Sequence, residues 1–290
     1  MENKIEFHAQ SFERLVQKPR DLGTVYHRSL WRDIVKEIRS NPVAIIAVTY
    51  LIVIITACLL APLSPYDPNG LDIMNKYQAP SAQHWFGTDQ FGRDYFTRAL
   101  YGGRVSLTVG FAAMLVTVFI GTTIGIFSGY IGGTLDMLLM VVLNSFLTPS
   151  MTTLVLVLSL FSWASVARIT RAETMSLKER DFVIASKNLG VNSFRIAVRH
   201  ILPNILGPVT VAASLGIASA ILTESSLSFL GLGISVPNAS WGSMLDAAQD
   251  VVLDRPMMAV YPGLLILLTV LSFNILGDVL RSALEPKIVK

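Results

Sequence analysis

The sequence predicts an all-α integral membrane protein, a polytopic bundle of spanning helices with nominally six spans. Hydrophobic residues make up 52% of the 290 positions and charged residues only 15%, whereas soluble domains are about a quarter charged. The mean hydropathy is +0.55. The apolar runs are about 20 residues long, which favours spanning helices over the alternating segments of an outer-membrane barrel. The single cysteine, Cys58, excludes a disulfide within the chain and a cysteine-based metal site.

Residues 1–40 are predicted to be a cytoplasmic N-terminal segment. Eight Lys or Arg stand against six Asp or Glu, and basic residues cluster just before the first apolar run, which favours the cytoplasmic side. A helix over about residues 29–40, with Trp31, Ile34 and Ile38 on one side, would lie along the membrane surface. A plain solvated segment explains the same residues. No cleavable signal peptide is expected, because no apolar core follows a short basic start.

The first span is predicted over residues 41–63, which are apolar throughout. Asn41 and Pro42 open it, and three prolines lie at or just beyond its end. Residues 64–104 then carry four acidic and four basic residues among prolines and aromatic residues. This balance is typical of an extracytoplasmic, interfacial segment. Residues 105–290 are predicted to form the transmembrane core.

A second span is predicted over about residues 105–130. Four of its glycines recur at near-helical spacing, which permits close packing against another helix. They are Gly110, Gly121, Gly125 and Gly129. The next uncharged stretch, residues 137–167, exceeds one crossing but falls short of the about 40 residues that two crossings need.

The third and fourth spans are therefore predicted to be truncated. The N-terminal segment and the basic stretch that follows residue 167 both call for the cytoplasmic side, so an even number of spans must separate them. Two explanations stay open. Either about 15 to 25 residues are absent between about residues 144 and 153, an estimate based on the length of one crossing, or a deletion has left shortened or re-entrant helices.

Residues 168–204 form a polar island between long apolar runs. Seven basic residues stand against three acidic ones, which predicts a cytoplasmic position. Apolar positions on both sides of a break at Gly190 predict two short helices that form a hairpin outside the membrane. A short helix pair cannot bury an apolar face alone, so this face needs a partner.

A further span is predicted over residues 205–223, ending at Glu224. This carboxylate would line a translocation path, hydrogen-bond a neighbouring helix or mark the outer interface. Gly231 and Gly233 predict a non-helical turn at membrane depth, which is tolerable only against protein or water and therefore suits a path-lining position. The last span is predicted over residues 257–276, and the basic residues beyond it return the C-terminus to the cytoplasm.

The polar island also carries a motif. Ala185-Ser186, Gly190 and Leu202-Pro203 resemble the EAA coupling loop of membrane subunits of binding-protein-dependent ABC importers, with Ile184 in place of the motif's Glu and His200 in place of an Ile. In that family the loop docks into a groove on a separate ATPase subunit. The resemblance implies a set of contact residues: Lys178, Glu179, Arg180, Asp181, Ala185, Gly190, Arg195, Leu202 and Pro203.

Two more stretches resemble the dipeptide, oligopeptide and nickel branch of this family. Residues 84–94 resemble its HxFGTDxxGRD element, and residues 228–242 its SFLGLGxxxPxxSWG element. In the first, Asp89, Arg93 and Asp94 are candidates for contact with a partner protein outside the membrane. Capping and anchoring of the following helix explains the same residues.

No enzyme active site is expected. The sequence lacks a G-x-x-x-x-G-K-[ST] phosphate loop, and its four histidines are too scattered to ligate a metal. No cofactor is therefore expected on this chain, and ATP and Mg²⁺ are expected on partner subunits.

The resemblance implies a permease subunit of an ATP-driven peptide importer in the cytoplasmic membrane of a prokaryote. It also implies the partners: a second homologous permease subunit, two ATPase subunits, an extracytoplasmic binding protein, a peptide substrate and membrane lipid, with no nucleic acid. Nickel or another small solute is the alternative cargo. A secondary transporter is a less favoured alternative, because the spans offer no internal repeat and few charges. A membrane anchor without transport is also disfavoured.

Overall fold

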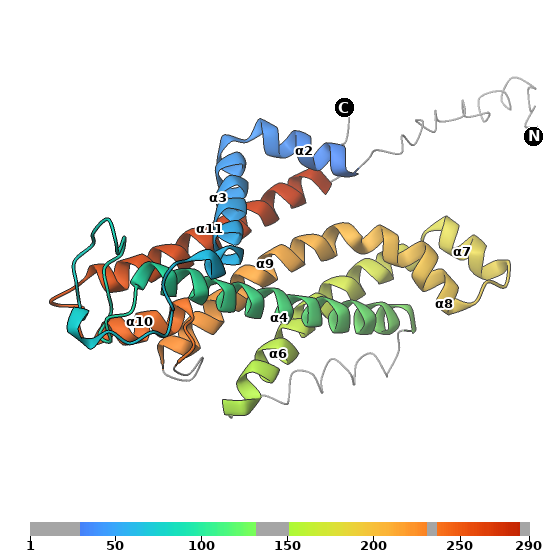
Figure 1. Ribbon diagram of the computed structural model, residues 1–290. Coiled ribbons are helices and arrows are strands. Elements are labelled where there is room, and N and C mark those ends of the chain that lie inside the picture. The colour runs from blue at the N-terminus through green and yellow to red at the C-terminus, as the bar shows by residue number, and fades with distance from the viewer. Residues whose placement is uncertain (1–29, 132–150, 231–236, 285–290) are drawn as a thin grey trace, which may run out of the picture.

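The computed structural model describes residues 30–131, 151–230 and 237–284 (Figure 1). Within these ranges the regular elements are helices, and the single isolated β-bridge joins Thr88 and Asp94. Four helical stretches are long and apolar enough to cross a membrane, namely Pro42–Leu59, Tyr95–Tyr130, Ser193–Phe229 and Met257–Leu284. The protein is therefore a multi-pass membrane protein.

Helices α2 (Leu30–Ser40) and α3 (Pro42–Leu59) meet at Asn41. The Asn41 Oδ1 accepts the backbone N–H of Val43 at 3.0 Å and that of Ala44 at 3.3 Å, so it caps α3. The predicted helix before the first span is confirmed, and it packs against α11 and α3. The span's α-helix ends at Leu59, because Pro62 supplies no N–H to continue the ladder, and the 3₁₀ turn η1 (Ala61–Leu63) follows.

Helix α4 (Tyr95–Ile131) begins ten residues before the predicted second span. The Asp94 Oδ2 accepts the Thr97 N–H at 2.7 Å, which caps the helix at this earlier point. Its 37 residues extend about 56 Å at about 1.5 Å per residue, longer than the about 30 Å hydrocarbon core of a membrane. The first turns of α4, with the loop that contains the 3₁₀ turn η2 (Ile73–Asn75), therefore stand beyond the hydrocarbon.

Helix α6 (Met151–Lys178) packs along α4 at the predicted glycines. A Cβ at Gly121 would meet Trp163 and Val166, and one at Gly129 would meet Arg171 and Thr174. Glycine is needed here because the two backbones approach so closely. Both sets of numbers rise together, so α4 and α6 run parallel and the chain between them returns to the end where α4 began. The predicted truncation falls mainly on residues 132–150, which lie outside the described ranges.

Four elements follow α6 in close succession. They are α7 (Asp181–Asn188), α8 (Ser193–Ile196), the π-helical turn η3 (Ala197–Ile201) and α9 (Leu202–Phe229). The polar island is thus less separate from the membrane than predicted. Helix α6 runs into it without interruption, and α8, η3 and α9 form one continuous helical stretch.

Helices α10 (Trp241–Gln249) and α11 (Met257–Leu284) complete the fold. Ser240 and Ser243 form a capping box at the start of α10. Trp241 is fully buried in a core to which α3, α4, α9, α10 and α11 all contribute. Helix α11 extends eight residues beyond the predicted end of the last span.

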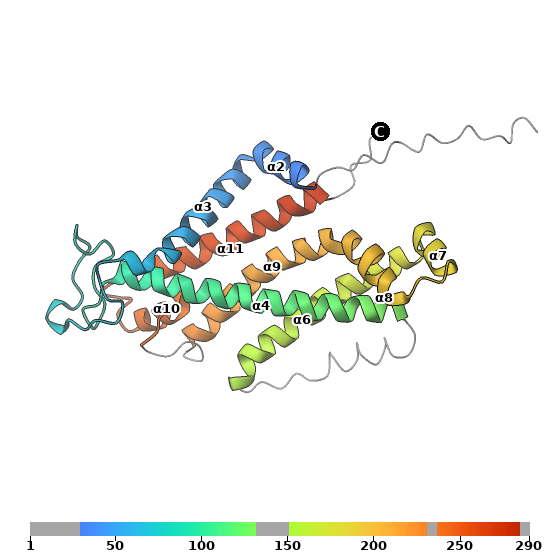
Figure 2. The ribbon, with the colours of Figure 1, turned by 45° about the vertical axis from the view of Figure 1, so that its right-hand side comes forward.

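The molecule has two distinct ends. Figure 2 shows α2, α7, α8 and the C-terminal end of α11 at one end, and α10 with the loop before α4 at the other. The long helices run between these ends, so each end offers its own surface to partners.

Candidate functional site

The hairpin between α6 and α9, residues 179–201, is the first candidate site, and Gly190 sets its shape. Gly190 has a φ of +76°, a conformation that glycine adopts without steric cost. The Val191 N–H donates to Ser186 O at 3.2 Å and the Gly190 N–H to Lys187 O at 3.0 Å. This Schellman motif ends α7 and turns the chain toward α8, where the Asn192 side chain accepts the Phe194 N–H.

One apolar face of the hairpin packs against its own chain. Val183, Ile196 and Ile201 are almost fully buried and cluster with Ile126 of α4 and Ile205 of α9. The sequence predicted that the hairpin's apolar face needs a partner. For this part of the face the spanning helices are that partner, so the hairpin is anchored to the inner ends of α4 and α9.

A second apolar set remains exposed on the hairpin. Leu189 at its tip is 83% exposed and Phe194 is 64% exposed, and Phe182, Ile184 and Val198 are also exposed. Such a concentration of exposed apolar side chains is typical of a protein interface. The surface that remains for a partner is therefore narrower than the sequence indicated, and it is centred on the tip.

The predicted coupling residues lie on or beside this exposed surface. Arg180 and Asp181 begin α7, where the Asp181 carboxylate favours the helix N-terminus. Lys178 ends α6 with its ammonium 5.9 Å from the centre of the Tyr130 ring. Glu179, Ala185, Arg195 and Pro203 are exposed, whereas Leu202 is half-buried. The structure brings these residues together around the hairpin, and their role in coupling stays a prediction.

The hairpin joins α9 through the π turn η3, and Pro203 explains this turn. Pro203 has no N–H to donate to Arg199 O, so the regular α-helical ladder is interrupted there. The Leu202 N–H instead bonds to Ala197 O, five residues back. π turns often mark sites where a helix bends. The Leu202-Pro203 corner is therefore a defined junction between hairpin and span.

The second candidate site, at the other end, is built around the buried Asp89. Its Oδ1 accepts the N–H groups of Phe91 at 2.9 Å and Arg93 at 3.0 Å, and its Oδ2 lies 2.7 Å from Arg93 Nε and 3.4 Å from Arg98 Nε. Asp89 is 2% exposed and Arg93 5%. This pattern fits the anchoring role that the sequence left open, because buried side chains offer little surface to a partner.

Asp94 and its neighbours tie the same loop to α4. The Asp94 Oδ1 lies 2.8 Å from His84 Nδ1, while its Oδ2 caps α4. Thr88 Oγ1 accepts the Gln78 N–H at 2.7 Å and donates to Asn75 O at 2.6 Å. The motif around residues 84–94 thus fixes a long loop onto the start of a spanning helix.

Glu224 lies inside α9, not at the end of a span as predicted. It is 7% exposed. Its Oε2 accepts the hydroxyl of Ser106 on α4 at 2.9 Å, and its Oε1 that of Ser228 at 2.7 Å. The Ser106 Oγ in turn accepts the backbone N–H of Trp241 at 3.3 Å. Of the three roles that the sequence left open, this geometry favours the bond to a neighbouring helix.

Sequence reasoning missed Ser106 and Trp241 as partners of Glu224, because the contacts join residues more than 100 positions apart. No local signal distinguishes Ser106 from other small residues of its span. The other path-lining candidates, Gly231 and Gly233, lie outside the described residues. Within the described ranges, no group of three or more His, Cys, Asp or Glu is placed to hold a metal ion.

Comparison with known proteins adds a family to this geometry. A family model described as binding-protein-dependent transport system inner membrane component matches residues 108–290. A model of the N-terminal transmembrane domain of oligopeptide transport permease C matches residues 29–80. Together the two models cover the spanning helices and the hairpin.

Curated relatives match over most of their length. A dipeptide transport system permease protein of Alkalihalophilus pseudofirmus is 39% identical over 277 residues, covering 89% of this chain and 90% of the relative. An oligopeptide transport system permease protein of Bacillus subtilis is 36% identical, covering 90% and 91%. A glutathione transport system permease protein of Pectobacterium atrosepticum is 36% identical, covering 90% and 92%.

Proposed function

We propose that this chain, which belongs to the family of binding-protein-dependent transport system inner membrane components, is a permease subunit of an ATP-driven importer of peptides. The observation that carries the proposal is the exposed apolar tip of the hairpin, on a chain whose sequence contains no phosphate-binding loop. A surface of this kind fits a separate protein that supplies the energy.

The partner at the hairpin is an ATPase subunit. Leu189 and Phe194 would enter an apolar groove on it, and the surrounding charges, Arg180, Asp181 and Arg195, would fix the orientation. Two such subunits would serve this chain and a second, homologous permease subunit. ATP and Mg²⁺ would bind to the ATPase subunits.

The geometry supports transmission of movement from the hairpin to the spans. Helix α6 enters the hairpin without a break, and α8 leaves it as the start of α9 through η3. Val183 and Ile196 hold the hairpin to the inner ends of the spans. A displacement of the hairpin as a rigid body would therefore tilt α6 and α9 and switch the path between inward-open and outward-open states.

The end that carries the hairpin faces the cytoplasm. The positive-inside rule supports this orientation, because the polar island has seven basic against three acidic residues. Helix α2 and the C-terminal end of α11 lie at the same end, so both termini are cytoplasmic. The Asp89 loop and α10 then face outward, where a binding protein delivers substrate.

The proposed cargo is a peptide. Relatives of nearly equal similarity carry names that specify dipeptides, oligopeptides and glutathione. These substrates share a peptide backbone but differ in length, so peptide is the substrate class that the similarity supports.

The proposed path runs beside an exposed polar stripe on α9. Ser219 and Ser226 are exposed, Thr223 is half-buried, and a Cβ at Gly216 would meet nothing within 4 Å among the described residues. Glu224 lies on the packed side of the same helix and would hold α9 against α4. Gly231 and Gly233 remain path-lining candidates on sequence grounds.

Uptake measurements test the proposal. The full complex would be reconstituted in liposomes with its binding protein and a radiolabelled tripeptide, and uptake followed with ATP, with a non-hydrolysable ATP analogue, and with a proton or sodium gradient alone. Uptake that depends on ATP hydrolysis, and that disappears with hydrolysis-deficient ATPase subunits, is the expected result. Uptake that continues on an ion gradient while hydrolysis is blocked would contradict it.

A further inference from the structure

Five apolar side chains stand exposed on two loops at the end opposite the hairpin, and we call them the outer patch. Met74 in η2 is 93% exposed, and Leu253, in the connection between α10 and α11, is 95% exposed. Leu71, Ile73 and Val252 are exposed beside them in sequence. Values this high show that the side chains project from the molecule with almost no contact to it.

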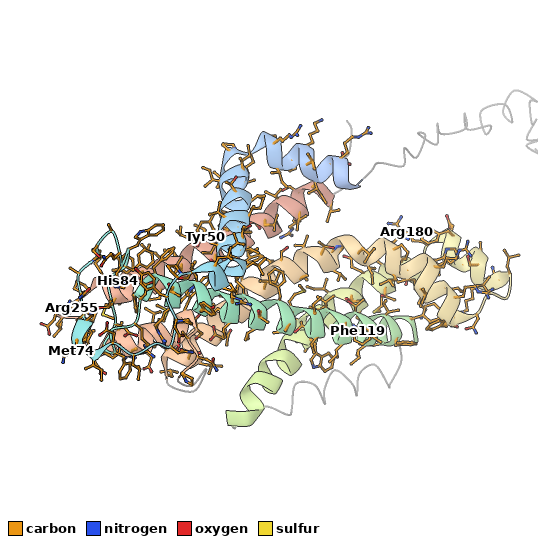
Figure 3. The ribbon with its side chains drawn as sticks, viewed as in Figure 1. Tyr50, Met74, His84, Phe119, Arg180 and Arg255 are labelled. Carbon is orange, nitrogen blue, oxygen red and sulfur yellow. The ribbon has the colours of Figure 1, made fainter. Side chains whose placement is uncertain are left out.

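The two loops of the outer patch are tied together. The Arg255 Nη1 donates to Tyr77 O at 2.5 Å, and the Arg255 guanidinium lies 5.0 Å from the centre of the Tyr77 ring. Arg255 follows Leu253 by two residues, and Tyr77 follows Met74 by three. Figure 3 shows Met74 and Arg255 near each other at one end of the molecule, with Arg180 of the hairpin at the far end.

The outer patch is also held rigidly from below. The Asp72 N–H donates to Phe91 O at 2.9 Å, and Thr88 Oγ1 donates to Asn75 O just after Met74. Both contacts lead to the loop that Asp89 fixes to the start of α4. A preorganised apolar surface loses little entropy when it binds, which favours binding over a purely structural or accidental exposure.

The position and the rim of the patch point to its occupant. It lies on loops beyond the first turn of α4, whereas a second spanning subunit would cover the flanks of the spanning helices. Asp72, Asp250 and Asp254 outnumber Lys76 and Arg255 around it, and all five are exposed, so the rim disfavours anionic lipid headgroups. An apolar centre within a charged rim is typical of a protein interface.

We propose that the outer patch is the docking surface for the substrate-binding protein on which this family's transport depends, with Met74 and Leu253 as its two anchors. The inference rests on the proposed function and on the outward orientation of this end. The charge of the rim predicts basic residues on the facing surface of the binding protein.

Stimulation of ATP hydrolysis by the binding protein tests the inference. The reconstituted complex in nanodiscs would be titrated with the purified, peptide-loaded binding protein of its own transport system. Met74→Asp combined with Leu253→Asp should raise the concentration for half-maximal stimulation at least about tenfold, because anchor residues carry most of the energy of an interface. Leu63→Asp is the matched control, since Leu63 is 77% exposed but lies in η1 against α3 and α4.

The outcomes separate the inference from the function on which it rests. An unchanged half-maximal concentration in the double variant overturns the docking surface alone. A wild-type complex that the binding protein does not stimulate contradicts the proposed function, and the inference fails with it.

A second measurement keeps the inference testable where the charged variants assemble poorly. Cys58 is buried, so a fluorophore on Leu253→Cys, in a complex whose other subunits lack cysteine, labels one site. Its emission should shift when the binding protein is added. Emission that shows burial in lipid from the start, and no response to the binding protein, would overturn the inference in favour of a membrane contact.

Discussion

Asp89 and Gly190 each fix a turn on which a whole end of the molecule depends. Asp89 holds the backbone of residues 91 and 93 together with two arginines, and Gly190 supplies the left-handed conformation that ends α7. Neither residue is placed to react with a substrate. Both act by holding a surface in a fixed position for a partner.

Loss of the Asp89 carboxylate should destabilise the outer loop strongly. Asp89→Ala leaves the buried guanidinium of Arg93 without its nearest carboxylate, and breaking a buried ion pair in this way costs about 3 to 5 kcal/mol. A thiol-reactive dye that reports exposure of Cys58 during thermal unfolding measures the effect, in a complex whose other subunits lack cysteine. The exposed Asp254→Ala serves as control, and an Asp89→Ala complex that unfolds at the wild-type temperature would argue against the buried pair.

At this scale the sequence predicted residue types better than residue roles. The break at Gly190 followed from its type, because glycine favours left-handed conformations. The roles of Asp89 and Glu224 stayed open, because only the fold shows that their carboxylates face hydroxyl and guanidinium groups inside the protein. Val183 and Phe182 are adjacent apolar residues, and the sequence does not tell which one is buried.

At the scale of elements, the spanning helices continue into the surfaces that bind partners. Helix α4 extends outward to Tyr95, and α6 extends inward to Lys178. The sequence predicted where the apolar runs lie, but it placed several helix ends too close to the membrane. Polar residues do not end a helix unless a cap, a glycine or a proline does so, and the caps at Asp94 and Gly190 decide these ends.

The parallel packing of α4 and α6 depends on glycine. A Cβ at Gly125 would lie 2.6 Å from Thr170 Cβ and 2.7 Å from Ala167 O, whereas one at Gly216 of α9 would meet nothing within 4 Å. Alanine raises helix propensity by about 1 kcal/mol at both positions. Gly125→Ala should therefore lower the stability of the complex by about 1 to 3 kcal/mol through overpacking, while Gly216→Ala should not.

The same thermal unfolding assay compares the two alanine variants. Equal unfolding temperatures for Gly125→Ala and Gly216→Ala would show that α4 and α6 do not approach as closely as described.

At the scale of the whole molecule, the direction of the helices accounts for the span count that the sequence left in conflict. Because α4 and α6 run parallel, the chain between residues 131 and 151 returns across the distance they share. The first of the aligned relatives extends over 277 positions but covers 89% of the 290 residues here. That relative therefore carries residues without a counterpart in this chain, in agreement with the predicted shortening.

The two ends of the molecule form one transport cycle only if the hairpin transmits work to the spans. The hairpin is anchored by Val183 and Ile196 and exposes Leu189 and Phe194, so it contacts the spans and a partner at once. The sequence predicted this site from its charge and its motif. It could not show the anchoring, which joins Ile126 of α4 to residues about 70 positions later.

The number of peptides imported per ATP hydrolysed, in liposomes that carry the full complex, tests this account most directly. Gly190→Pro removes the N–H that donates to Lys187 O and excludes the φ of +76°, whereas Gly190→Asn tolerates that conformation. The account predicts that Gly190→Pro inserts normally but lowers the ratio about tenfold or more, equivalent to about 1.4 kcal/mol of coupling. It predicts a near-normal ratio for Gly190→Asn. Normal coupled uptake by Gly190→Pro would contradict it.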